Sequence, residues 1–350
     1  MGAFLLLLAV TLLWFLLPLL PALLELFRPT DLAPLKVVER SAGRVGYFAR
    51  NFRQYLAKVL PPEAGAGDYA GRMLDGTEFL RVNHRPAALQ EQRGTGDLAR
   101  NRIVLLDTPQ TLPGGETFLM ELYARAPLTG GPRAVYRAVY AEQELALGEG
   151  SQVLRWTHAG GRLSVSAHSV LRGRVSSEAA VTLGNDVVFE RIGAPVISAG
   201  PQHEPPPGLP AALPLHRLPA EARRIGEHLR IEGDLEIPSG VRVSDNLVVA
   251  GRLRVGLGAM VEGSVKSHRE IELADEAQVT GSVVTRTRLL VGQAAWIGGP
   301  AIAEQSIRLG KGAVVGSAAQ PATVTAPEVE LATGATVYGQ ISAPRAGRTL

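Results

Sequence analysis

The last third of the chain repeats its apolar positions every six residues and repeats whole phrases every eighteen. GAMVEGSV, EAQVTGSV, AAWIGGPA and GAVVGSAA begin at residues 258, 276, 294 and 312. Stepping by six from Leu235 to Ala319, all fifteen positions are apolar, and so are twelve of the fifteen positions two residues further on. Apolar residues at i and i+2 indicate a short strand with one buried face.

Three such strands with their turns make one coil of eighteen residues. Stacked coils, about 4.8 Å apart, predict an all-β fold, a three-faced β-solenoid. A helix would need a period near 3.6, which this pattern does not fit. Glycines such as Gly263, Gly281 and Gly299 follow the strand positions, where a sharp corner is needed. After Ala319 the phase slips by four residues and resumes at Val329.

An earlier block carries the same signature less cleanly. The pairs Leu145/Leu147, Leu163/Val165 and Val181/Leu183 are again eighteen residues apart. A proline-rich run separates this block from the regular one, and prolines exclude regular strands there. The two blocks are expected to form one continuous solenoid or two stacks side by side. We predict a connecting region over 61–104, an irregular solenoid block over 105–198, a linker over 199–227, a regular solenoid over 228–345 and a tail over 346–350.

The N-terminus predicts a transmembrane anchor over 1–27. Residues 1–24 carry no charged side chain, and such a helix spans a hydrocarbon core of roughly 30 Å. A cleaved signal peptide is the alternative, but no basic residue precedes the run and no small-residue cleavage site follows it. Basic residues lie only after the run, which places the solenoid in the cytoplasm, anchored to a bacterial inner membrane by a single pass.

Residues 28–60 predict a basic amphipathic juxtamembrane helix. Phe48, Phe52 and Leu56 recur at helical spacing among arginines. In one interpretation this helix lies on anionic lipid headgroups; in the other it packs on the folded domain. The candidate membrane-surface residues are Lys36, Arg40, Arg44, Arg50, Arg53 and Lys58.

The end of the regular block bears on assembly. Only the nine residues SAPRAGRTL follow Ile341, which predicts an open coil edge that stacks on another chain. Several outward positions late in the block are apolar, and we treat them as a candidate interaction patch for a partner, the membrane or the other block. The patch residues are Val284, Leu290, Trp296, Ile302 and Val314, and in the alternative interpretation residues 61–130 cover them.

The tandem phrases LRVGLGAMVEGSV, IELADEAQVTGSV, IRLGKGAVVGSA and VELATGATVYGQI resemble the bactofilins, the bacterial polymer-forming cytoskeletal proteins. The resemblance implies a triangular β-helix that assembles end to end without nucleotide into membrane-associated filaments, which scaffold proteins of the cell wall or envelope. The anchor, the long N-proximal region and the proline-rich insertion depart from that pattern. We expect a structural scaffold whose partners are itself, the inner membrane and an envelope or cell-wall protein; a non-polymerising envelope adaptor is the alternative.

An enzyme is the distant alternative, because hexapeptide-repeat acyltransferases resemble this chain in their apolar positions. Their chemistry needs a histidine base, and only His268 lies in the regular block. His158 and His168 lie in adjacent coils but lack a third zinc ligand at sensible spacing. The absence of cysteine excludes disulfides and thiolate sites. Basic residues are not interleaved with aromatics as in nucleic-acid binding. We therefore predict no catalytic, cofactor or metal site, no nucleic acid and no small-molecule substrate.

Overall fold

The computed structural model describes residues 1–17, 46–60, 68–82, 101–206, 213–216 and 222–350. The chain divides into two units, Met1–Arg44 and Val45–Leu350. The first contains helix α1 (Gly2–Leu16), whose large apolar side chains, such as Phe4 and Trp14, are exposed. Within the described ranges no helix is both long and apolar enough to cross a membrane. The rest of the predicted anchor lies outside them, so the anchor stays a prediction.

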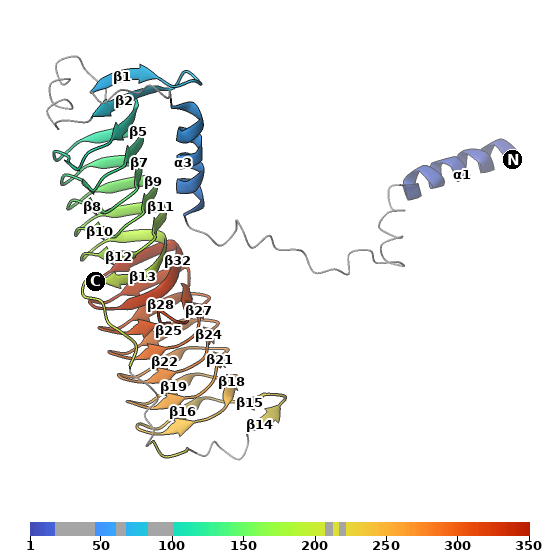
Figure 1. The fold of residues 1–350 in the computed structure, drawn as a ribbon. Coiled ribbons are helices and arrows are strands. Elements are labelled where there is room, and N and C mark those ends of the chain that lie inside the picture. Colours follow the sequence, from blue (N-terminus) through green and yellow to red (C-terminus); the bar gives the residue numbers. More distant parts are fainter. Residues whose placement is uncertain (18–45, 61–67, 83–100, 207–212, 217–221) are drawn as a thin grey trace. The chain divides into compact units, whose positions relative to one another are not determined.

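The second unit is a β-solenoid, as the pattern predicted, and its first part uses long, bent strands (Figure 1). We call residues 103–199 the first solenoid. One column of parallel strands comprises β3 (Ile103–Leu106), β5 (Thr117–Ala124), β7 (Val135–Ala141), β9 (Gln152–Ala159), β11 (Val170–Ser177) and β13 (Val188–Ala199). The other comprises β4 (Gln110–Thr111), β6 (Leu128–Thr129), β8 (Leu145–Leu147), β10 (Leu163–Val165) and β12 (Ala180–Leu183).

Residues 223–349, which we call the second solenoid, have three columns of short parallel strands. The first is β15 (His228–Ile231), β18 (Asn246–Val249), β21 (Val265–Ser267), β24 (Val283–Thr285), β27 (Ala301–Ala303) and β30 (Ala322–Thr325). The second is β16 (Leu235–Ile237), β19 (Leu253–Val255), β22 (Ile271–Leu273), β25 (Arg288–Val291), β28 (Ser306–Leu309) and β31 (Glu328–Leu331). The third is β17 (Arg242–Val243), β20 (Met260–Val261), β23 (Gln278–Val279), β26 (Trp296–Ile297) and β29 (Val314–Val315). Strand β32 (Thr336–Thr349) pairs with β29, β30 and β31 and so completes all three columns.

The eighteen-residue register is confirmed in the second solenoid. Leu235 pairs with Leu253, and Leu253 with Ile271, while across the slip Ser306 pairs with Glu328. The polar exceptions at the inner positions, Ser267 and Thr285, point inward and are buried. The Ser267 hydroxyl donates to the Gly251 carbonyl at 2.6 Å, and Thr285 donates to that of Arg269, each one coil earlier. A buried hydroxyl is tolerated here because a corner carbonyl accepts its hydrogen bond.

The two solenoids meet at their last coils. Strand β13 pairs antiparallel with β32 along its length: Val188 lies opposite Arg348, Ile192 opposite Ile341 and Ile197 opposite Val337. Figure 1 shows the two strands side by side at this junction. The blocks are therefore neither one continuous coil nor two stacks side by side; they stack end to end with opposite chain direction.

The junction corrects two predictions. The edge after Ile341 is not open, because β13 of the same chain occupies it. Nor are residues 346–350 a tail, since Ala346–Thr349 pair with Val329 and its neighbours. Thr349 is buried, accepts a hydrogen bond from the Val187 amide at 2.8 Å and donates one to the Gly184 carbonyl at 2.7 Å. Glycine is favoured at position 347, because a Cβ atom there would clash with the ring of Phe189.

Each outer end of the double stack carries an antiparallel hairpin. Strands β1 (Tyr69–Arg72) and β2 (Glu78–Val82) pair with each other, and β2 adds to β3. The predicted connecting region thus begins the fold. At the other end β14 (Arg223–Ile225) pairs with β15, and Pro214 and His216 hydrogen-bond to Arg242 of β17. Among the described residues no strand pairs with the outer edge of β16.

Candidate interaction surfaces

Helix α3 (Tyr47–Val59) packs on the first solenoid. Its inner side chains Ala49 and Leu56 are 2% exposed. Around them lie Met73, Phe79, Ile103, Leu105, Tyr123, Tyr140 and Trp156. The helix runs along the stack, with Phe48 beside Arg174 of β11, Phe52 beside Trp156 of β9 and Val59 at the β1–β2 hairpin. Of the two interpretations of this helix, packing on the folded domain is confirmed for Tyr47–Val59.

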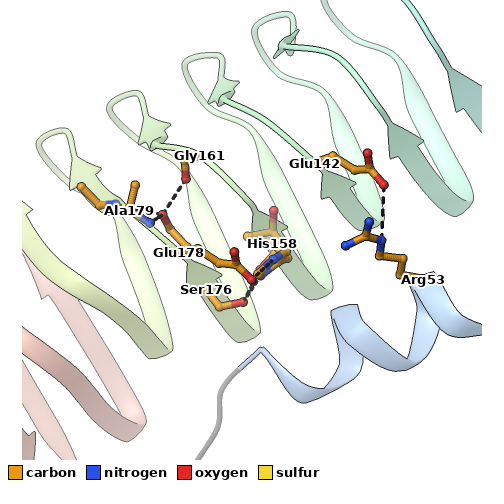
Figure 2. Close-up of polar contacts among 10 residues, drawn as sticks. Arg53, Glu142, His158, Gly161, Ser176, Glu178 and Ala179 are labelled. Atoms are coloured by element: carbon orange, nitrogen blue, oxygen red, sulfur yellow. Dashed lines mark hydrogen bonds and ion pairs between the residues drawn. The ribbon is translucent and has the colours of Figure 1, made fainter.

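The basic side of α3 faces away from this contact. Arg50, Arg53 and Lys58 are exposed, although the Arg53 guanidinium lies 3.4 Å from Glu142 (Figure 2). Lys36, Arg40 and Arg44 lie outside the described residues. Lipid contact through the basic residues therefore stays a prediction, but the apolar side of α3 is already occupied by protein.

Beneath α3, four successive coils place ring or hydroxyl side chains in one column. Tyr123, Tyr140, His158 and Ser176 occupy paired positions in β5, β7, β9 and β11. The rings of Tyr123 and Tyr140 stack at 5.3 Å and those of Tyr140 and His158 at 5.0 Å, close to the spacing between coils. Burial and a hydrogen bond to Glu142 raise the pKa of Tyr123. The column provides a flat aromatic floor for the helix.

His158 ends this aromatic column and is held neutral. Its Nδ1 lies 2.8 Å from the Ser176 hydroxyl, and its Nε2 lies 4.0 Å from a Glu178 carboxylate oxygen (Figure 2). Burial, with the positive charge of Arg50 nearby, lowers the pKa of His158 to about 4. Serine, histidine and glutamate resemble a hydrolytic triad by type. However, His158 and Ser176 are 4% and 6% exposed, and Gly46 lies over both, so substrate has no access to the hydroxyl.

The other histidines weighed from the sequence lie apart from it. His168 sits on an exposed corner, 3.6 Å from Asp186 and 3.9 Å from Glu149. His268 lies at a corner of the second solenoid after β21. No group of three or more histidine, aspartate or glutamate side chains arranged to hold a metal ion occurs in the part of the chain that the structure describes.

The five residues of the candidate patch lie on three different faces. Val284 pairs with Ile302 in the first column and Trp296 with Val314 in the third, while Leu290 belongs to the second. Ile302 is 39% exposed, Val314 only 3%, and the others lie between. The Trp296 indole donates to the Gly316 carbonyl at 3.2 Å. A single patch of these five residues is therefore not formed.

Among the described residues, two parts of the proline-rich segment lie against the third-column face. His203 donates its amide to the Thr336 hydroxyl at 2.9 Å and accepts from the Tyr338 hydroxyl at one end of the face, and Pro214–His216 pair with β17 at the other. Residues 103–129 instead build coils of the first solenoid. The segment returns the chain to the far end of the stack, as the opposite direction of the two solenoids requires.

Val284 and Val248 line an open groove of about 350 Å³ beside the β14–β15 hairpin. Its polar margin is a column of corner residues, in which the Ser264 amide donates to Asn246 at 2.7 Å and the Ser282 amide to Ser264 at 3.1 Å. Lys266 and His228 also line the groove. Of the five residues of the predicted patch, only Val284 lines this groove.

Comparisons with known proteins identify no relative of this chain. No protein-family model matches the chain, and neither a curated protein nor a solved structure matches it.

Proposed function

We propose that the protein is a membrane-anchored, non-enzymatic β-solenoid adaptor that holds an envelope or cell-shape partner at the inner membrane. One observation carries the proposal: the last coils of the two solenoids pair with each other within the chain. Polymerisation through the C-terminal end would need an unpaired edge on the last coil. In this chain β13 already pairs with that edge. A partner would then bind to the long faces of the stack.

The outer ends support the same conclusion. A sheet edge is protected by short strands, hairpins, proline and charge, and the β14 end combines these with Arg223 and Arg224. Two of the three columns at this end are covered, one by β14 and one by Pro214–His216. The resemblance of the repeats to bactofilins agrees with a scaffold role, and the charge-free run at 1–24 with anchoring.

Self-association, as in a polymer-forming scaffold, remains the second candidate because of the outer edge of β16. Leu235–Ile237 pair with β19 on one side, and no described strand lies on the other. Two chains joined through this edge would form an end-to-end dimer, and extension to a filament would need a second open edge, such as that of β4.

Two measurements test the proposal. In bacterial cells expressing the full chain, we expect the protein in the membrane fraction after alkaline carbonate washing, and in the soluble fraction once residues 1–17 are deleted. Electron microscopy of the detergent-solubilised chain should show separate short particles. Release of the full chain from the membrane by carbonate would contradict the anchor. Filaments in the micrographs would contradict the adaptor and favour a polymer-forming scaffold.

A further inference from the structure

The flank of the first solenoid beside helix α3 carries arginines that form no ion pair with a described acidic residue. Arg155, Arg172 and Arg191 are exposed, and Arg174 is partly so. Among the described residues none of these four forms an ion pair, and neither does Arg50 of α3. Most of the described arginines elsewhere are paired, as Arg254 is with Glu272 and Arg288 with Glu270, and the unpaired ones are not gathered beside α3. Their positive charge is therefore not neutralised by an ion pair among the described residues.

These arginines come from three consecutive coils. Trp156, Arg174 and Arg191 are register partners in β9, β11 and β13, and Arg155 and Arg172 lie at the bend just before this position. The charges thus follow the stack axis at intervals of about 4.8 Å. Helix α3 runs along the same flank, with its exposed Arg50 close enough to His158 to lower the pKa of that residue.

Apolar side chains lie exposed among the charges. Tyr47 is 40% exposed, and Phe48 and Leu154 are each 43% exposed. The nearby Glu190 carboxylate accepts a hydrogen bond from the Gly173 amide at 3.0 Å. Arginines with interspersed aromatic and leucine side chains on one side of a protein are typical of surfaces that meet anionic headgroups, where the cations bind phosphate and the apolar groups enter the acyl boundary.

We propose that this arginine flank binds anionic lipid headgroups, so that the first solenoid lies along the membrane surface and does not project from it. The proposal rests on the membrane anchoring argued above. The chain order favours lipid over an acidic protein, since apolar helix α1 ends at Leu16 and the flank begins with α3 at Tyr47. The proposal also assigns a role to the exposed basic face of α3, whose apolar side packs on the first solenoid.

The test uses the full chain in vesicles of phosphatidylcholine alone or mixed with phosphatidylglycerol. Because the chain has no cysteine, Leu154→Cys and Ser164→Cys each provide one labelling site, on the flank and on another exposed face. A fluorophore at 154 should be quenched by headgroup-labelled lipid only in the anionic vesicles, and high salt should remove the quenching. The fluorophore at 164 should stay unquenched in both.

Charge variants complete the test. R155Q/R172Q/R174Q/R191Q should lower quenching at 154 at least tenfold, since each arginine near an anionic surface contributes about fivefold in affinity. The control R133Q/R162Q/R269Q/R286Q removes four exposed arginines that also form no ion pair among the described residues, and it should retain the quenching at 154. Equal thermal unfolding of both variants verifies their fold.

The outcomes separate this inference from the anchor. A chain that sediments with both kinds of vesicle, yet shows equal quenching at 154 and 164 or none at either, overturns the lipid proposal alone and leaves an acidic protein as the partner of the flank. A chain that sediments with neither kind overturns the anchor as well.

Discussion

The two solenoids differ in their cores and in what covers their outer faces: the first buries Phe118, Tyr136 and Phe189 among its aliphatic side chains, whereas the core of the second is aliphatic. The second keeps an eighteen-residue register, and its outward positions carry mixed polar and apolar side chains. In the first, Val135 pairs with Gln152 seventeen residues on, and its strands shift register at a bend. The outward column of Tyr123, Tyr140 and His158 is buried because α3 lies on it.

The difference shows what makes a repeat visible in a sequence. Where a coil contacts only the coils above and below it, every coil needs apolar side chains at the same positions, so these positions recur in the sequence. Where another element docks, the outer positions must fit that element, and side chains of different sizes replace the repeat. The following experiments test this contrast, starting with the largest expected effect.

Removing the first solenoid should change the association state of the second. A fragment of residues 222–350 would expose the edge of β32, which β13 covers in the intact chain. We expect dimers or larger species by size-exclusion chromatography with light scattering, because an unpaired edge templates pairing. The unit of residues 46–350, in which the edge is paired, serves as the control and should be monomeric. A monomeric 222–350 fragment would show that the junction is not needed to protect this edge.

Charging the inner side of α3 should free the helix while sparing the second solenoid. Leu56→Asp places a carboxylate in the cluster around Met73 and Phe79 and should cost about 4 kcal/mol. Hydrogen exchange should rise along α3 and β9 but not along β19 or β22. Ala57→Asp, at an exposed neighbouring position, is the control and should behave like the wild type. Unchanged exchange in α3 of Leu56→Asp would contradict its docking.

Acid should destabilise the first solenoid through His158. Its pKa is lowered from 6.5 to about 4 in the folded state, so the unfolded chain binds the proton more tightly. The stabilisation is complete above the ordinary pKa and is lost as the pH falls through about 4, with a total of roughly 3 kcal/mol.

The measurement is the free energy of unfolding in urea at pH values of about 7 and about 4.5. His158→Gln should show a smaller fall than the wild type, whereas His168→Gln, at an exposed corner, should show the wild-type fall. The same carboxylates are present in all three proteins, so the comparison isolates the effect of the replaced histidine. Equal falls in the wild type and His158→Gln would refute the role of His158.

The corner hydroxyls should matter equally in both solenoids. Ser177 donates to the Gly161 carbonyl at 2.7 Å and accepts the Ala179 amide at 3.0 Å, as Ser267 does with Gly251 and Arg269. Ser177→Ala and Ser267→Ala should each cost about 1–2 kcal/mol, because buried backbone groups lose a partner. Ser164→Ala, at an exposed position, should change unfolding by less than about 0.5 kcal/mol. A cost confined to one solenoid would show that the two corners are not equivalent.

The strand positions of the second solenoid were predictable because a buried face needs an apolar side chain at a fixed spacing. The inward Leu289 and the outward Arg308 follow from that rule alone. The rule does not say in which direction one block runs relative to the other. It therefore predicted an unpaired edge at the C-terminal coil, which β13 in fact covers. The proline-rich run was the available signal, since a long return segment permits the reversal.

The candidate surfaces were less predictable for a different reason. Outward apolar residues such as Trp296 and Val314 indicate that something is covered or bound, but not what covers them. His158 carried no sequence signal beyond its type, because its burial depends on α3, whose apolar spacing fits lipid and protein equally well. Arg155 and Arg191 lie 36 residues apart and become neighbours of one flank only through the coil register.

The antiparallel junction between the last coils is the central claim, and a pair of introduced cysteines tests it most directly. Arg191 of β13 and Ser342 of β32 are register partners, so R191C/S342C should form a disulfide within the monomer under mild oxidation. R191C/E236C joins β13 to the first coil of the second solenoid, which would lie next to it if the chain continued in one direction. The account predicts an intramolecular disulfide in the first pair and none in the second, and the reverse result would contradict it.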